Sequence, residues 1–416
     1  MDATVRPLGR PDISQPQLGA ESRLSIHYYI PVATVYFFLN RAGLPLGLFY
    51  TSIFAPLLYF WLYLKGQRWL TTKFILILSP FILAHFIEGV ESPLQYLRSL
   101  FLLWTVYIAV YAFCWALTRS TTIERLFDQL IILNLFVAFL ALVIRPTPLW
   151  PLLWSDSGNV AGTTHLLRMN LQSTTEPWAY GQLMLPLLVF AAYRVFMYGG
   201  TRNVLYLAMI VFPFLLCQSF GGISLSVAAI IVMILADIKR FLGRVQSWIF
   251  LLCSAIAAVP LIIVSNPISR RVGQVLTGSD DSTQLRAFFA YPAAWTIAAS
   301  KSLWWGVGIG QMKLLNLPLL GHGIENTLPN ATAQTLAEWG LIGVTVKLSI
   351  EFYLLFRTRT YSNSFRLAMF IVAFFSQLTG SYNDDVQSYL LWFFAFYPAF
   401  SKVNSDTQSR LVTVSR

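Results

Sequence analysis

Charged residues are scarce in this chain, and that scarcity limits what it can be. Only 11% of the 416 residues are charged, against roughly 25% in soluble domains, and 56% are apolar. No stretch of balanced composition is long enough for a nucleotide-binding domain, which excludes cytosolic enzymes built on one. The composition predicts an all-α, polytopic integral membrane protein.

Cysteine and apolar leader segments are also lacking. Cys114, Cys217 and Cys253 all fall inside apolar runs, so neither a disulfide framework nor a Cys-rich metal site is expected. Residues 1–24 are polar, and we expect no targeting peptide. The acidic runs at 280–281 and 383–385 are expected to be solvated turns, because a divalent cation needs several converging oxygen ligands. The sequence therefore predicts no metal and no cofactor.

Long apolar runs are abundant, and a helix needs roughly 20 apolar residues to cross a bilayer. We expect about 12 membrane-spanning helices, at 26–41, 45–64, 73–90, 98–118, 127–145, 178–198, 203–219, 222–238, 247–265, 333–356, 365–380 and 386–401. Residues 203–238 as one helix would be about 54 Å long, so two spans are expected there. The tails are 1–24 and 402–416, with spans one to nine within 25–265, a loop at 266–332, and the last three spans within 333–401.

The net charge of +11 follows the expected topology. With a cytoplasmic N-terminus, 19 of the 29 Lys and Arg residues fall on the cytoplasmic side, as expected from the positive-inside rule. Both termini are then cytoplasmic. Seven outward cations, mostly arginine, lie in or directly beside two long outer segments, 146–177 and 266–332. These segments contain tryptophans that disorder would not favour, so we expect folded caps on the outer face.

The larger outer segment combines aromatic residues with a glycine-rich run. Asp281 or Ser282 could cap a short helix lying at the membrane interface, with Arg286 near its start and Trp295 within it. The run 306–310 (GVGIG) could bring backbone N–H groups close to an anion. No parallel strand and crossover surround it, so we favour a tight turn packed against the bilayer surface.

Two further groups of polar residues border the spans. Asn330, Gln334 and Glu338 recur every four residues and would share one helix face. They could form a solvated helix end, or Glu338 could face an internal cavity. Glu176-Pro177 fits a helix start, as capping alone or as part of a site. Arg168 lies outside and could bind a lipid phosphate through its guanidinium.

The order of these residues resembles the O-antigen ligase and polymerase superfamily. The resemblance rests on Arg286, Trp295, the run 306–311, and then Asn330, Gln334 and the stretch from Glu338 to Gly343. The segment from Arg168 to Glu176-Pro177 is similar to the Arg and Glu-Pro motif of its exopolysaccharide and capsule polymerases. The resemblance implies a glycosyltransferase of the bacterial inner membrane that joins glycans carried on undecaprenyl diphosphate at the periplasmic face. It implies action without metal.

Such a reaction needs cations and a base. Fixed cations would stabilise the charge that develops on the leaving diphosphate, and we choose Arg168 and Arg286 first, then Arg270 and Arg271. A sugar hydroxyl that attacks needs a proton acceptor; Glu338 is the first choice, with Glu176, Glu325 and His322 behind it. We assign the remaining polar and aromatic positions, Asn330, Gln334 and Trp295, to glycan binding.

Three functions remain open. The family pattern has a His directly before the Asn, where this chain has Pro329, which favours a polymerase over a ligase that transfers glycan to lipid A core. A polymerase would work with a lipid-linked donor, a glycan acceptor, membrane lipids, and chain-length regulator and flippase proteins, and with no nucleic acid. Ionisable residues within spans, such as His85 and the pair Lys347 and Glu351, would also fit a lipid-linked oligosaccharide transporter.

Overall fold

The computed structural model describes most of the helical part of the chain. It covers residues 43–44, 48–119, 123–157, 166–169, 177–217, 220–243, 248, 273, 277, 289–312, 328, 330–379 and 386–397. The expected span 26–41, the expected span 247–265 except residue 248, and both tails lie outside these residues.

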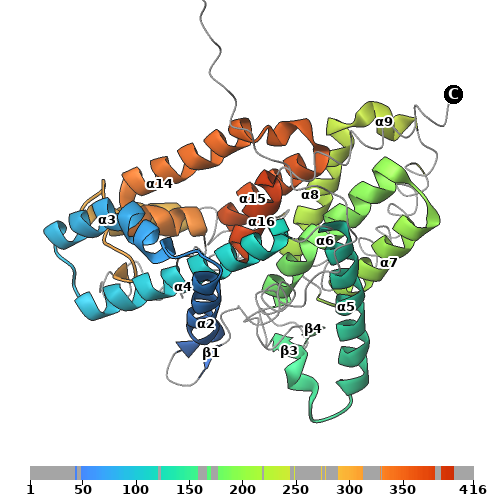
Figure 1. Cartoon of the computed structure of the whole chain (residues 1–416), viewed down its shortest axis with the longest axis horizontal. Helices are drawn as coiled ribbons and strands as arrows, with labels where there is room; N and C mark the ends of the chain where they lie inside the picture. The colour runs from blue at the N-terminus through green and yellow to red at the C-terminus, as the bar shows by residue number, and fades with distance from the viewer. Residues whose placement is uncertain are drawn as a thin grey trace, which may run out of the picture.

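Helices dominate the described residues, as expected from the composition (Figure 1). They are α2 (Tyr50–Leu64), α3 (Leu70–Glu88), α4 (Pro93–Arg119), α5 (Ile123–Ile144), α6 (Pro177–Tyr198), α7 (Thr201–Leu216), α8 (Phe220–Ala236), α9 (Ile238–Leu242), α13 (Ala290–Ala299), α14 (Ala331–Arg357), α15 (Ser364–Thr379) and α16 (Val386–Phe396). Two 3₁₀ turns, η2 (Trp150–Leu152) and η6 (Thr360–Ser362), complete the helical elements.

By length and composition alone, five of these helices could cross a bilayer. Each expected span that falls on described residues is occupied by a helix, and the five longest apolar segments are Leu70–Glu88, Pro93–Leu117, Glu124–Ile144, Tyr180–Tyr198 and Ala331–Arg357. The stretch 203–238 is divided as expected, because α7 ends at Leu216 and α8 begins at Phe220. The protein is therefore a helical membrane protein.

Helix α6 lies at the centre of the bundle. Within its most apolar 18-residue stretch 94% of the residues are buried, against 11% in the corresponding stretch of α3, whose large apolar side chains mostly face outwards. Helices α7 and α8 pack on α6, and α15 packs on both α8 and α16. Outward apolar side chains cost nothing in lipid, so this difference fits a bundle surrounded by hydrocarbon.

Two short antiparallel strand pairs accompany the helices, which the all-α expectation did not include. Strand β1 (Gly43–Leu44) pairs with β2 (Leu48–Phe49), and β3 (Trp154–Ser157) pairs with β4 (Leu166–Met169). The second pair lies in the expected outer segment 146–177. The indole N–H of Trp154 donates to the carbonyl of Ala141 at 2.7 Å, which fastens this hairpin to the end of α5.

Helix α14 occupies the expected span 333–356 but bends sharply, which the sequence analysis did not predict. Gly340 has φ 65° and ψ −168°, outside the helical region. Asn330 bonds to the carbonyl of Leu378, and Glu351 bonds to the neighbouring Gln377. In a straight helix those two positions of α14 would be about 31 Å apart. The helix therefore has a first arm, 331–339, and a second arm, 341–357, which turn back towards each other at Gly340.

The far end of α14 is fixed by a buried arginine. The guanidinium of Arg366 donates to the carbonyls of Thr358, Ala395 and Phe396 at 2.9–3.2 Å. These carbonyls belong to the last turns of α14 and α16, where a positive charge is favoured by the helix dipole. Arg366 therefore holds the ends of α14, α15 and α16 together.

Candidate active site at the α14 break

The break in α14 is filled by the loop 303–310, which we call the glycine loop. The carbonyls of Ala337 and Glu338 accept from the N–H groups of Val307 and Gly308, each at 3.0 Å. Across the break, the N–H groups of Leu341 and Ile342 donate to the carbonyls of Leu303 and Trp304, at 3.0 and 3.1 Å. Unpaired backbone groups cost several kcal/mol inside a membrane. The glycine loop pairs the backbone groups that the break in α14 leaves without helical partners, and so makes the break tolerable.

Glycine is required on both sides of this contact. Gly340 has a positive φ, and a Cβ there would overlap the carbonyl of Trp304. A Cβ on Gly306, with φ 78°, would lie 2.6 Å from the carbonyl carbon of Glu338. L-residues rarely adopt these backbone angles, and no side chain fits between the two segments.

The tight turn expected at 306–310 is present, but it packs against protein instead of the bilayer surface. Its three glycines have positive φ angles. The N–H groups of Val307 and Gly308 bond to α14, and that of Gly310 donates to Oε1 of Glu338 at 3.1 Å. A phosphate cradle would need such N–H groups for the anion. The N–H groups of this loop therefore bind α14 and do not form an anion site.

Glu338 is buried, which corrects the solvated helix end that we considered for it. Its side chain is 5% exposed, and the carboxylate is held by the N–H of Gly310. The rings of Phe81, Trp305 and Trp339 pack around the break, with centroids of neighbouring rings 5.3–5.7 Å apart. The structure thus places a carboxylate in a fixed position inside an apolar helical protein.

Asn330 and Gln334 lie on the first arm of α14 with Glu338, as the spacing predicts. The side-chain oxygen of Asn330 caps α14 by accepting from the N–H groups of Thr332 and Ala333, each at 3.0 Å, and its amide donates to Leu378. Glycan contact by Asn330 would require these bonds to open. Gln334 is also buried, and among the described residues its Oε1 has no partner.

Trp295 is not brought to Glu338. Helix α13, which contains it, packs on α14 through a face of small residues that includes Ala290, Ala294 and Ala298. Trp295 lies on another face and is 50% exposed. The described part of the expected interfacial helix therefore packs on α14, and its place at the membrane interface stays a prediction.

The structure adds His85, which the sequence analysis noted only as an ionisable residue within a span. His85 is 2% exposed, its Nε2 lies 2.7 Å from the carbonyl oxygen of Trp305, and its Nδ1 lies 2.8 Å from the hydroxyl of Tyr96. Nothing in the local sequence connects a lone histidine at 85 with residue 305. Only the packing of α3 against the glycine loop could reveal it.

The residues on either side of the glycine loop fasten it to the turn between α3 and α4. The amide of Gln311 makes two hydrogen bonds with the backbone of Ser92, at 2.9 and 3.2 Å. The ammonium of Lys301 pairs with the carboxylate of Glu91 at 2.9 Å. The loop is thus held from α3, α4 and α14 at once.

The other expected site residues are not placed at the break. Arg168 lies on β4 opposite Ser155, and the structure describes only its backbone. The positions Glu176, Arg270, Arg271, Arg286 and His322 lie outside the described residues. The expected grouping of arginines around Glu338 therefore stays a prediction.

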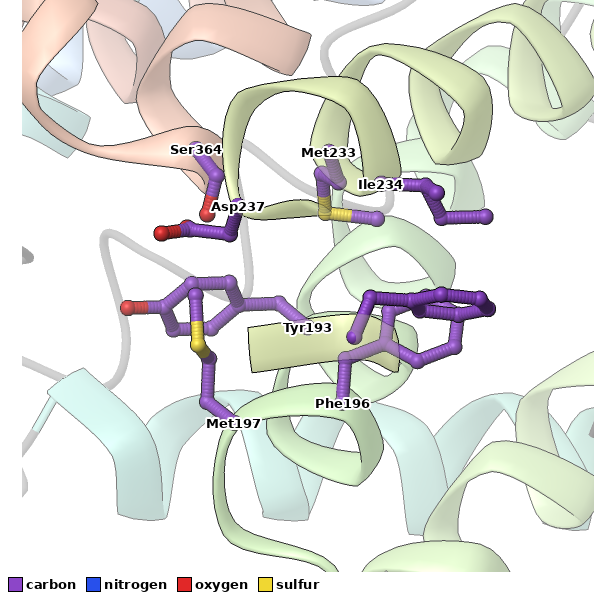
Figure 2. Close-up of a pocket in the computed structure, with 8 residues that line it drawn as sticks. Tyr193, Phe196, Met197, Met233, Ile234, Asp237 and Ser364 are labelled. Atoms are coloured by element: carbon purple, nitrogen blue, oxygen red, sulfur yellow. The ribbon is translucent and has the colours of Figure 1, made fainter. Parts of the chain in front are cut away.

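Figure 2 shows a small pocket elsewhere in the molecule. It lies where α6, α8 and α9 meet the start of α15, and its polar lining includes Asp237 and Ser364. It has room for about one water molecule. Ser364 follows the far end of α14, about 25 Å along the helix from the break, so this pocket belongs to a different part of the molecule.

Neither a metal site among the described residues nor a related protein indicates the function. Across the described ranges, no three His, Cys, Asp or Glu residues are grouped so that they could hold a metal ion. No protein-family model matches the chain, and a search of curated proteins finds no match either.

Proposed function

We propose that this protein is a membrane glycosyltransferase that joins undecaprenyl-diphosphate-linked glycan repeat units, acting as an O-antigen, capsule or exopolysaccharide polymerase. One observation carries the proposal. Glu338, at the position that resembles the motif of that superfamily, is a buried carboxylate fixed at a helix break. A carboxylate held in one position can accept the proton of a sugar hydroxyl as that hydroxyl attacks.

In the proposed reaction, one bond to the anomeric carbon of the donor breaks and another forms. The acceptor hydroxyl attacks the anomeric carbon of the donor glycan, the bond from that carbon to the diphosphate oxygen breaks, and Glu338 takes the hydroxyl proton. The leaving undecaprenyl diphosphate keeps the electron pair of the broken bond. Arg168 and Arg286 would stabilise its charge, with Arg270 and Arg271 next, and Glu176 and His322 are the alternative bases.

We further propose twelve spans in the bacterial inner membrane, with both termini cytoplasmic and the reaction at the periplasmic face. The distribution of charge at helix ends supports this topology. Arg194 at the end of α6 and Arg202 at the start of α7 both pair with Asp128 near the start of α5, so three cation-rich ends meet. Lys301 pairs with Glu91 at the turn that follows α3, on the side expected to be periplasmic.

The test is chain elongation by the purified protein. It would be reconstituted in liposomes with a lipid-linked repeat unit, and products would be separated by length. Because general bases contribute 10²–10⁴-fold, we expect Glu338→Gln to slow elongation by at least about 100-fold. Glu88→Gln is the control: this carboxylate is exposed at the end of the adjacent α3, and its variant should elongate at the wild-type rate.

Two results would contradict the proposal in different ways. Wild-type rates for Glu338→Gln would remove Glu338 from the reaction. A wild-type protein that never elongates the repeat unit would overturn the polymerase. In cells, a gene deletion that leaves the lipid A core bare would indicate a ligase, whereas a single repeat unit on the acceptor supports a polymerase.

A lipid-linked oligosaccharide transporter is the second candidate, because α14 is a discontinuous helix. Transporters commonly place such breaks at their binding sites. The same liposomes distinguish the two functions: a transporter would move the lipid-linked glycan across the bilayer without lengthening it.

A further inference from the structure

His85 joins two helices to the glycine loop through one imidazole. Because Nε2 faces the carbonyl oxygen of Trp305, Nε2 carries the hydrogen and donates it. Nδ1 is then the acceptor for the hydroxyl of Tyr96 on α4. Both nitrogens are used, and the tautomer is fixed by these partners.

The loop that His85 holds is the loop that holds Glu338. Trp305 is followed by Gly306, which lies against the backbone of Glu338 too closely for any side chain. Four residues further on, the N–H of Gly310 donates to the carboxylate of Glu338. A shift of the carbonyl of Trp305 would therefore move both the backbone and the carboxylate of Glu338.

We propose that His85 is a positioning residue for Glu338 in the glycosyl transfer, acting through its Nε2–H bond to Trp305. This inference rests on the proposed function. The imidazole of His85 also interacts with the backbone of Glu338, so its effect reaches the carboxylate through the glycine loop and through the backbone of α14. A base displaced by about 1 Å can lose roughly 100-fold in rate.

The loop does not depend on His85 alone for its fold. The bonds of Gln311 to Ser92 and of Lys301 to Glu91, and the backbone pairs with α14, remain in a His85 variant. A variant should therefore insert and fold while Glu338 loses its exact placement. This allows the role of His85 to be measured in an intact protein.

Two amide substitutions separate the two nitrogens of His85. The amide nitrogen of Gln reaches the position of Nε2 and can donate to Trp305, whereas the shorter Asn reaches the position of Nδ1 and cannot. We expect His85→Gln to keep kcat within about threefold of wild type. His85→Asn and His85→Ala should lower kcat by about 100-fold with the KM for the lipid-linked donor unchanged.

Ile87→Ala is the control, because Ile87 lies two residues away on α3 and is 85% exposed. Its kcat and KM should equal those of wild type. Equal kcat for His85→Gln and His85→Asn, or a change confined to KM, would overturn the proposal.

A second measurement separates this inference from the proposed function. Labelling of Glu338 by an apolar carbodiimide, followed by mass spectrometry, needs no enzymatic activity. We expect His85→Asn and His85→Ala to be labelled several times faster at Glu338 than wild type, and His85→Gln at the wild-type rate. Identical labelling of all four proteins would overturn the positioning role even if the protein proves to be a polymerase, and the expected pattern would support it even if no elongation is found.

Discussion

At the residue scale, Gly340 and Glu338 lie two positions apart in α14 and have different roles. Gly340 allows the chain to reverse, because its backbone angles are closed to other residues. Glu338 lies near the end of the first arm, and its carboxylate is fixed by the glycine loop. The reversal is thus what brings the glycine loop and the carboxylate into contact.

Gly340→Ala should destabilise the protein strongly. The substitution adds backbone strain at a positive φ and an overlap with the carbonyl of Trp304. We expect a loss of about 3 kcal/mol in the free energy of unfolding, measured by denaturant titration in detergent with tryptophan fluorescence.

Gly200→Ala is the matched comparison for that substitution. Gly200 also has a positive φ, 85°, but no atom lies within 4 Å of the position a Cβ would take. It should lose only about 1 kcal/mol, from backbone strain alone. Equal losses in the two variants would show that contact with the glycine loop adds nothing.

At the element scale, the first arm of α14 depends on its cap. Asn330 both caps this arm and bonds to the end of α15, so one side chain positions the arm relative to the bundle. The sequence places Asn330 on the same helix face as Gln334 and Glu338, and the structure confirms that they belong to one helical segment.

Asn330→Ala and Asn330→Ser should separate these two roles. Serine keeps a capping oxygen but is too short to reach Leu378, so we expect a loss of about 1 kcal/mol for Ser and about 2 kcal/mol for Ala. Thermal unfolding in detergent would measure both. If the two variants unfold at the same temperature, the cap is not what stabilises the arm.

At the scale of the whole molecule, the buried α6 and the outward-facing α3 describe a bundle surrounded by lipid. Cation-rich ends meet around Asp128, whereas Glu91 lies in the turn that follows α3, which our proposal places on the other side of the membrane. This separation is the basis of the topology that we propose.

Labelling of single cysteines would test that topology. In a variant without the native cysteines, Arg68→Cys lies in the turn after α2 and Leu149→Cys lies beyond α5, where the side chain is 55% exposed. An impermeant maleimide should label position 149 in cells with a permeable outer membrane, and position 68 only once the inner membrane is opened. Labelling of both in intact inner membranes would contradict the topology.

The sequence predicted the helices well because each apolar run must be a helix wherever lipid surrounds it. It placed the division between α7 and α8 from length alone. It did not predict the bend of α14, since Gly340 is one glycine in an apolar run and a glycine in a helix is often tolerated. It also did not predict that the helix containing Trp295 packs on α14, because Ala290, Ala294 and Ala298 recur with helical spacing and mark a packed face without identifying its partner.

What the sequence determined by itself is the membrane environment, the helical class and most helix positions, because these follow from composition and the cost of unpaired backbone in hydrocarbon. The tertiary structure alone decided that Glu338 is buried, that the glycine loop pairs with the α14 break, and that His85 reaches Trp305. Those contacts join residues more than 25 and more than 200 positions apart. Their geometry depends on how the helices pack, which no local pattern records.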